Sequence, residues 1–125
     1  MTILWVALGG AIGAAGRYSV NVWSGRLVGT AFPWHTLTVN VLGCFIMGAL
    51  VELMALKLNV SNDIRAFLTT GILGGFTTFS AFSLDFALLV ERKSYLAAGA
   101  YAAGSVVVSL AAVFAGLHLV RALAQ

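Results

Sequence analysis

Residues 74–83, which read GGFTTFSAFS, decide the fold that this sequence predicts. They lie inside a long apolar run, residues 63–92, and an unbroken helix over that run would be roughly 45 Å long at about 1.5 Å per residue. Because the hydrocarbon core of a bilayer is only about 30 Å thick, such a helix either tilts strongly or breaks. The pair Gly74-Gly75 is costly inside a helix, and the hydroxyls of Thr77, Thr78, Ser80 and Ser83 can bond backbone carbonyls and bend or re-satisfy an interrupted turn. We therefore expect the break within this stretch, in the middle of the membrane. Unwound backbone at that depth must be buried or line a wet cavity, which makes this stretch the candidate site for handling an ion.

The composition of the whole chain points to lipid as its solvent. The chain has 125 residues, of which 61% are hydrophobic and 9% are charged. No soluble domain of this length could bury so much apolar surface, so we predict an all-α integral membrane protein with one domain, residues 1–125. The net charge of +3 comes from scattered basic residues, which argues against nucleic acid as a partner. The single cysteine, Cys44, excludes a disulfide within one chain and a cysteine metal cluster.

Four apolar runs predict four transmembrane helices, at about residues 3–28, 36–56, 63–92 and 95–123. The N-terminus lacks the basic segment of a signal peptide, so we expect the first run to be retained as a span. Within it, Gly9, Gly13 and Gly16 fall on one face and predict a flat stripe for close helix packing.

The cations that flank the four runs show almost no bias between the two sides of the membrane. Three lie on the side of the termini and three on the opposite side: Lys57, Arg65 and Arg121 against Arg26, Arg92 and Lys93. Because Lys/Arg asymmetry sets orientation, this balance predicts that the chain inserts both ways and forms an antiparallel, dual-topology homodimer. The alternative is that the weak bias reflects short loops and that orientation is fixed by something else.

The polar residues expected at membrane depth are nearly all neutral hydrogen-bond donors. They are Asn40, Thr77, Thr78, Ser80, Ser83, Tyr101, Ser105 and Ser109. Donors of this kind, away from fixed negative charge, suit an anion rather than a cation. The alternative for any one serine is a packing residue that donates to the carbonyl four residues earlier. Several such groups on facing helices favour an anion pathway.

Three further features surround the expected break. Phe79 and Phe82 lie beside it, and the positive edges of their rings can replace part of an anion's hydration shell; the alternative is ordinary lipid-facing or core phenylalanine. Carbonyl groups freed around Gly74 and Thr77 can hold a small cation such as Na⁺, shared on the axis of an antiparallel pair as a structural ion. Arg17, a charge inside the first span, either draws anions into a vestibule or extends to the interface.

Other functions fit the sequence less well. A small multidrug-type exporter of cations is also short, four-spanned and of dual topology, but such proteins resemble one another in a buried glutamate in the first span, and residues 3–28 contain no acidic residue. An accessory subunit without transport of its own does not explain hydroxyl lines on two separate spans. We expect no enzyme, because the sequence shows no nucleophile–base pair and no metal-ligand set.

Two motifs resemble those of the Fluc (CrcB-type) fluoride channels. They are WHTLTVN at residues 34–40, followed by Gly43, and GGFTTFSAFS at residues 74–83. The resemblance extends over nearly the whole chain, including its length, its four spans and the arginine of the first span. It implies passive, selective export of F⁻ across the bacterial plasma membrane by a multi-pass, antiparallel homodimer with two pores.

The resemblance also implies roles for individual residues. Phe79 and Phe82 look like the two pore phenylalanines, Asn40 like the pore asparagine, and Arg17 like the vestibule arginine. The expected polar track consists of Thr78, Ser80, Tyr101, Ser105 and Ser109. Gly74 and Thr77 look like the positions whose carbonyls hold the central Na⁺. Asp85 lies at a position that is acidic in this family, and the resemblance assigns it no role.

Overall fold

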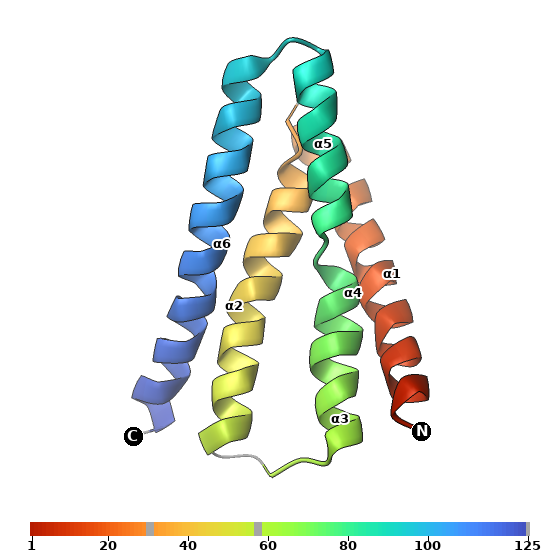
Figure 1. Ribbon diagram of the computed structural model, residues 1–125, viewed down its shortest axis with the longest axis vertical. Coiled ribbons are helices and arrows are strands. Elements are labelled where there is room, and N and C mark those ends of the chain that lie inside the picture. Colours follow the sequence, from red (N-terminus) through yellow and green to blue (C-terminus); the bar gives the residue numbers. More distant parts are fainter. Residues whose placement is uncertain (30–31, 57–58, 125) are drawn as a thin grey trace.

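The computed structural model describes residues 1–29, 32–56 and 59–124, and every regular element in this part of the chain is helical (Figure 1). The helices are α1 (Thr2–Val28), α2 (Trp34–Leu56), α3 (Asn62–Ala66), the π-helix η1 (Phe67–Leu73), α4 (Gly74–Phe76), α5 (Phe79–Glu91) and α6 (Tyr95–Ala124). Four rods are long and apolar enough to span a membrane, with α3 to α5 together forming the third. The predicted all-α fold with four spans is confirmed, and the two termini lie at the same end of the molecule.

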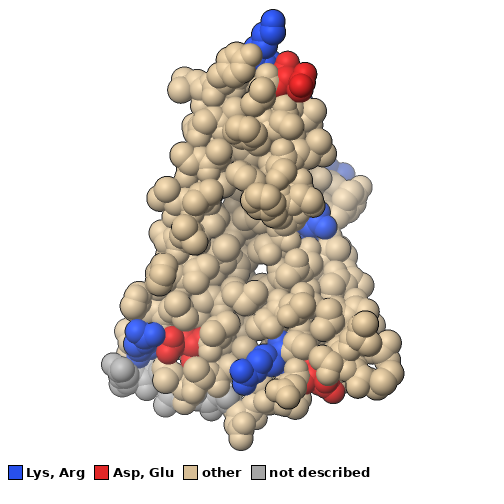
Figure 2. Space-filling view, in the orientation of Figure 1, with Lys and Arg blue, Asp and Glu red and all other residues tan. Residues whose placement is uncertain are grey.

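The surface is that of a protein solvated by lipid. Most charged side chains of the face in Figure 2 lie at its two ends, and the broad band between them carries blue only along its right edge. Large apolar side chains on this chain are widely exposed; Leu96, for example, is 90% exposed. Few side chains are buried in the part of the chain that the structure describes, and one buried hydrophobic cluster joins Leu89 of α5 to Ala98 and Tyr101 of α6.

Glycine contacts hold α1 against the third rod. A Cβ atom on Gly9 would lie 2.8 Å from the Cα atom of Gly71, and one on Gly13 would lie 2.8 Å from the backbone nitrogen of Phe76. No larger residue fits at these distances. Gly9 and Gly13 of the predicted glycine stripe therefore lie where two helix backbones meet, whereas a Cβ atom on Gly16 would meet only the Phe76 side chain, at 3.5 Å.

A second close pair is formed by α2 and α6, which run side by side in Figure 1. A Cβ atom on Gly116 would lie 2.7 Å from the backbone nitrogen of Ala49, so α6 also approaches α2 through a glycine. Near the terminal end, an Arg121 guanidinium nitrogen donates to Glu52 Oε2 at 3.0 Å. Helix α1 thus packs on the first part of the third rod, α3 to α4, whereas α5 packs on α6, which in turn pairs with α2.

The third rod leaves the helical conformation at Thr77 and Thr78, within the stretch 74–83. Thr77 has φ −85° and ψ 158°, and Thr78 has φ −156° and ψ 131°. Gly74 and Gly75 remain helical, and a Cβ atom on Gly75 would lie 2.7 Å from the carbonyl oxygen of Gly10. Gly75 therefore serves close packing against α1, and the extended residues of the stretch are the two threonines.

The two threonines compensate for the hydrogen bonds that the turn loses. The backbone N–H and the hydroxyl of Thr77 both donate to the carbonyl oxygen of Leu73, at 3.0 and 2.9 Å. The hydroxyl oxygen of Thr78 accepts from the backbone N–H of Ala81 at 3.1 Å and caps the start of α5. Threonine is thus suited to both sides of this interruption.

Candidate functional site

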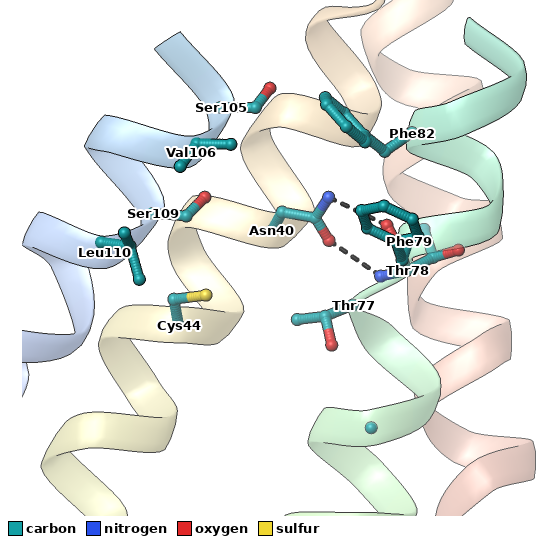
Figure 3. Close-up of a pocket in the computed structure, with 11 residues that line it drawn as sticks. Asn40, Cys44, Thr77, Thr78, Phe79, Phe82, Ser105, Val106, Ser109 and Leu110 are labelled. Carbon is teal, nitrogen blue, oxygen red and sulfur yellow. Dashed lines mark hydrogen bonds between the residues drawn. The ribbon is translucent and has the colours of Figure 1, made fainter. Parts of the chain in front are cut away.

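A groove with a volume of about 480 Å³ lies between α2, α6 and the segment from Gly74 to Phe82 (Figure 3). Eight of the residues predicted to handle ions line it: Asn40, Gly74, Thr77, Thr78, Phe79, Phe82, Ser105 and Ser109. Residues that are far apart in the sequence thus meet in one place. The remaining lining residues are Cys44, Val106 and Leu110.

Asn40 holds the extended backbone of Thr78 in place. Its Oδ1 atom accepts from the Thr78 N–H at 2.8 Å, and its Nδ2 atom donates to the Thr78 carbonyl oxygen at 3.0 Å, as the dashed lines in Figure 3 show. A side-chain amide carries two N–H donors, so one N–H remains for another acceptor. Asn40 therefore supports the interrupted backbone and keeps one donor beside the groove.

Ser105 and Ser109 present hydroxyl groups without protein partners. In the described part of the chain, the Oγ atoms of both are buried and make no hydrogen bond, and the Ser105 residue is only 5% exposed. Ser19 and Thr69 behave differently, because their hydroxyls donate to carbonyls four residues earlier, at 3.0 and 2.8 Å. Orphaned buried hydroxyls are costly, so these two hydroxyls are the candidate donors for a polar guest that enters the groove.

Three aromatic rings continue from the groove toward α6. The ring centroids of Phe79 and Phe82 are 5.6 Å apart, and those of Phe82 and Tyr101 are 5.1 Å apart. Phe79 is 77% exposed, whereas Phe82 is partly buried against the cluster around Tyr101. The two phenylalanines therefore differ, since only Phe82 contributes to the packing of the single chain.

Three of the predicted site residues do not line this groove. The Tyr101 hydroxyl donates to Asp85 Oδ2 at 3.2 Å, and the Ser80 hydroxyl is exposed and lies 3.2 Å from that of Thr78. Arg17 lies on the α1 side of the third rod, where its Nε–H donates to the Gly75 carbonyl oxygen at 3.2 Å. Arg17 thus binds the backbone just before the interruption.

Asp85 is the centre of a polar cluster that sequence reasoning did not assemble. Its Oδ2 atom accepts from the Thr36 hydroxyl at 2.6 Å and from Tyr101, and it lies 3.9 Å from His35 Nε2. The acceptor-only carboxylate therefore holds hydroxyl groups from both α2 and α6.

A regular spacing could have revealed part of this arrangement, including Cys44. Thr36, Asn40 and Cys44 recur at i, i+4 and i+8 on α2, the same spacing as Tyr101, Ser105 and Ser109 on α6. Two polar lines of equal period on two adjacent helices predict a shared polar interface.

The carbonyl oxygens of Gly74 and Thr77 are suitable ligands for a small hard cation, because each lacks its helical hydrogen bond. The N–H that would close a helical turn on the Gly74 carbonyl is that of Thr78, which donates to Asn40 instead. The N–H that would close a turn on the Thr77 carbonyl is that of Ala81, which donates to the Thr78 hydroxyl. Both carbonyls have thus lost the donors that an α-helix would supply.

Comparison with known proteins gives a consistent family assignment. A family model described as CrcB-like protein, Camphor Resistance (CrcB), matches residues 4–117. The Fluoride-specific ion channel FluC of Rhizobium etli is 58% identical over 120 residues, which cover 96% of each chain. Proteins of the same name from Agrobacterium fabrum and Rhodopseudomonas palustris are 57% and 53% identical. The match to the Agrobacterium protein covers 97% of each chain. The match to the Rhodopseudomonas protein covers 98% of this chain and 99% of the relative.

The family resemblance that the two sequence motifs indicated is therefore confirmed. Four apolar helices, together with bacterial relatives that are named as channels, fit a multi-pass protein of the bacterial inner membrane. On the match over residues 4–117 and on relatives more than half identical over almost their full length, this chain belongs to the CrcB-like family, which includes proteins named fluoride-specific ion channels.

Proposed function

We propose that this protein is a fluoride-specific channel, as the names of its relatives suggest, and that it lets F⁻ leave the cell passively. The observation that carries the proposal is the pair of buried, unpartnered hydroxyls of Ser105 and Ser109 in the groove. Hydroxyl and amide donors replace the water around a small anion, and binding spread over several weak sites lets the ion leave again.

The route that we propose runs along the two polar lines. Asn40 offers its remaining N–H, the hydroxyls of Thr78, Ser105 and Ser109 offer O–H donors, and the ring edges of Phe79 and Phe82 take part in the solvation of F⁻. We propose that the pore is too narrow for larger halides. Tyr101 and Ser80 extend the track beyond the groove, and Arg17 attracts anions from the α1 side.

We further propose that the working unit is an antiparallel homodimer of dual topology, with the interruption at Thr77–Thr78 in the middle of the membrane. The balanced flanking cations support this arrangement. The groove opens along one side of the single chain, and a second copy would close it and complete the pathway. Each copy would then contribute to two related pores.

A structural Na⁺ belongs to the same proposal. The carbonyls of Gly74 and Thr77 from both copies would hold it on the two-fold axis, because both lack their helical donors. The positive charge of the ion would offset the cost of bringing an anion nearby.

The alternative, a small multidrug-type cation exporter, gains no support. Helix α1 contains no acidic residue, and the groove is lined with neutral donors.

The decisive test is ion efflux from liposomes that contain the purified protein. We expect rapid efflux of F⁻ and no measurable efflux of Cl⁻ under the same gradient, read with ion-selective electrodes. Equal rates for the two anions, or no F⁻ efflux from folded protein, would contradict the proposed function.

A further inference from the structure

A second groove, with a volume of about 440 Å³, lies between the last turns of α1 and the first turns of α2. It is located toward the end of the molecule opposite the two termini, where α1 finishes and α2 begins (Figure 1). Most of the side chains that form its walls are apolar or aromatic: Val20, Trp23, Leu27 and Val28 of α1, with Trp34 and Thr38 of α2. None of these residues belongs to the proposed anion pathway.

The groove lies on the opposite side of α2 from the anion pathway. At 3.6 residues per turn, Thr38 is about 200° around the helix from Asn40. In the proposed homodimer the second copy covers the side of Asn40, so the groove beside Thr38 stays on the outside of the pair. The neighbour that this side of the protein meets is therefore the lipid of the membrane.

The length of the groove matches the depth of one leaflet. On α1 the groove extends from Ser19 to Val28, which is about 14 Å of helix at about 1.5 Å per residue. Half of the hydrocarbon core of a bilayer is about 15 Å thick. Because Val28 is the last residue of α1, the groove extends from the membrane interface toward the middle of the membrane, which is the course of an acyl chain.

Two tryptophans stand on the two sides of the groove, one on each helix. Trp23 and Trp34 are 63% and 47% exposed, and tryptophan is enriched at the level of the lipid headgroups. Trp34 packs against Phe32 with ring centroids 4.6 Å apart, and Phe32 packs edge-on against the buried Tyr101 at 5.5 Å. The wall formed by Trp34 is therefore fixed before a lipid binds, which lowers the entropic cost of binding.

Arg26 places a positive charge at the interfacial end of the groove. It is exposed in the last turn of α1, three residues after Trp23 and seven after Ser19, so the three residues share one face of the helix. The sequence contains no acidic residue before Glu52, which lies toward the opposite end of α2. The charge of Arg26 is therefore complementary to the phosphate of an anionic lipid headgroup, and no carboxylate of α1 or of residues 34–51 offsets it.

We propose that this groove binds one anionic phospholipid, with an acyl chain between α1 and α2 and the phosphate at Arg26. Van der Waals contact with a preformed wall holds the chain, and the arginine selects the headgroup. The bound lipid contacts both helices and fills the space that they leave between them.

The test uses tryptophan fluorescence, because bromine on an acyl chain quenches a tryptophan that it contacts. The chain contains three tryptophans, and Trp5 packs against Phe67 at the other end of α1, so a Trp5→Phe protein reports on the groove alone. This protein is reconstituted into phosphatidylcholine vesicles in which a rising fraction of the lipid is brominated phosphatidylglycerol or, in a parallel series, brominated phosphatidylcholine. We expect an about fivefold preference for phosphatidylglycerol, the factor that corresponds to about 1 kcal/mol for one arginine at a membrane surface.

Three variants in the same background identify the source of this preference. Arg26→Gln should be quenched equally by the two lipids, whereas Arg26→Lys, which keeps the charge, should keep the preference. Ser24→Phe, which fills part of the groove, should lose the preference although Arg26 is still present. Arg65→Gln, at an exposed site on α3 at the other end of the molecule, is the matched control and should behave as the parent. Size-exclusion profiles confirm that each variant is folded before reconstitution.

Several results would overturn the lipid site. Equal quenching of the parent by the two lipids, or a preference that Arg26→Gln retains, would remove the arginine as the headgroup ligand. A preference that Ser24→Phe retains would indicate attraction of anionic lipid to the surface in general rather than binding in the groove. Quenching by neither lipid would indicate that protein, for example a second copy of the chain, covers the groove. The measurement needs no ion flux, so a failure of F⁻ efflux leaves its result unaffected.

Discussion

The side-chain amide of Asn40 on α2 and the backbone of Thr78 form a reciprocal pair of hydrogen bonds, at 2.8 and 3.0 Å, across 38 residues of sequence. The amide satisfies the N–H and the carbonyl of Thr78, one of the two residues that lie between α4 and α5. An extended residue between two helices in an apolar medium needs such a partner, because unpaired backbone groups are costly there. Asn40 therefore both stabilises the fold and lines the proposed pathway.

Replacement of Asn40 by leucine, which has a similar size, should therefore impair both stability and flux. Asn40→Leu leaves the N–H and the carbonyl of Thr78 unpaired, at a cost of about 1–3 kcal/mol for each group. We expect a lower melting temperature in detergent and no measurable F⁻ efflux. Thr38→Leu on the exposed face of the same helix is the matched control. A stable Asn40→Leu protein with normal efflux would remove Asn40 from both roles.

Removal of the hydroxyls of Ser105 and Ser109 should reduce F⁻ flux without reducing the stability of the protein. Hydrogen bonds to a charged group contribute about 1.5–3 kcal/mol, so Ser105→Ala and Ser109→Ala should each slow F⁻ efflux roughly tenfold or more. The melting temperature should be unchanged or higher, because a buried hydroxyl without a partner is lost. Ser19→Ala, which removes a hydroxyl bonded to its own helix, should leave efflux unchanged. Normal efflux from the double variant would contradict a pathway through these hydroxyls.

Substitution of Phe79 and of Phe82 should both reduce F⁻ efflux, but only substitution of Phe82 should also reduce stability. Phe79→Ile should reduce F⁻ efflux sharply with little change in the stability of the single chain, since the Phe79 side chain is 77% exposed. Phe82→Ile should reduce both, because Phe82 packs against Tyr101 at a centroid distance of 5.1 Å. Phe114→Ile, at an exposed site on α6, serves as the control. If both variants conduct F⁻ normally, the aromatic edges play no part in solvation of the ion.

Sodium should matter for assembly rather than for transport as such. If the carbonyls of Gly74 and Thr77 hold Na⁺ at the two-fold axis, purification in N-methylglucamine salts should weaken the dimer, and return of Na⁺ should restore it. Cross-linking yield in detergent, measured over a series of Na⁺ concentrations, reads this directly. A dimer whose yield and F⁻ efflux are indifferent to Na⁺ would rule out a structural ion on the axis.

The spans could be predicted from the sequence because lipid leaves few choices. Segments as apolar as residues 36–56 and 95–123 must form helices that satisfy their own backbone, and the observed helices α2 and α6 start and end within about two residues of those bounds. The glycines of α1 were also predictable, since three of them recur on one helical face.

The details of the third rod could not be predicted because they depend on packing. Propensity alone places the interruption at Gly74-Gly75, but Gly75 is held in a helix by its close approach to Gly10. The π-helix over Phe67–Leu73 has no sequence signal that we could identify, and it brings the Gly71 backbone against Gly9. Tertiary contact between two backbones determines both features.

The residues that line the candidate site could largely be predicted from the sequence, but the hydrogen bonds that join its helices could not. Eight predicted residues line one groove. Asn40, Ser105 and Ser109 lie on the two polar lines with helical spacing, and the other five come from the stretch 74–83. The bonds from Asp85 to Thr36 and Tyr101 join three helices, and no local pattern indicates which helices will meet. For the same reason the proximity of His35 to Asp85 emerges only from the structure.

The most direct test of the central claim, that F⁻ moves through this groove, uses its only thiol. Cys44 lines the groove and is the single cysteine of the chain, so Hg²⁺ attaches at one known place. We predict that Hg²⁺ stops F⁻ efflux from liposomes, that added thiol restores it, and that Cys44→Ser conducts F⁻ but is insensitive to Hg²⁺. Protein that mass spectrometry shows to carry mercury on Cys44, and that still conducts F⁻ at the original rate, would contradict the claim.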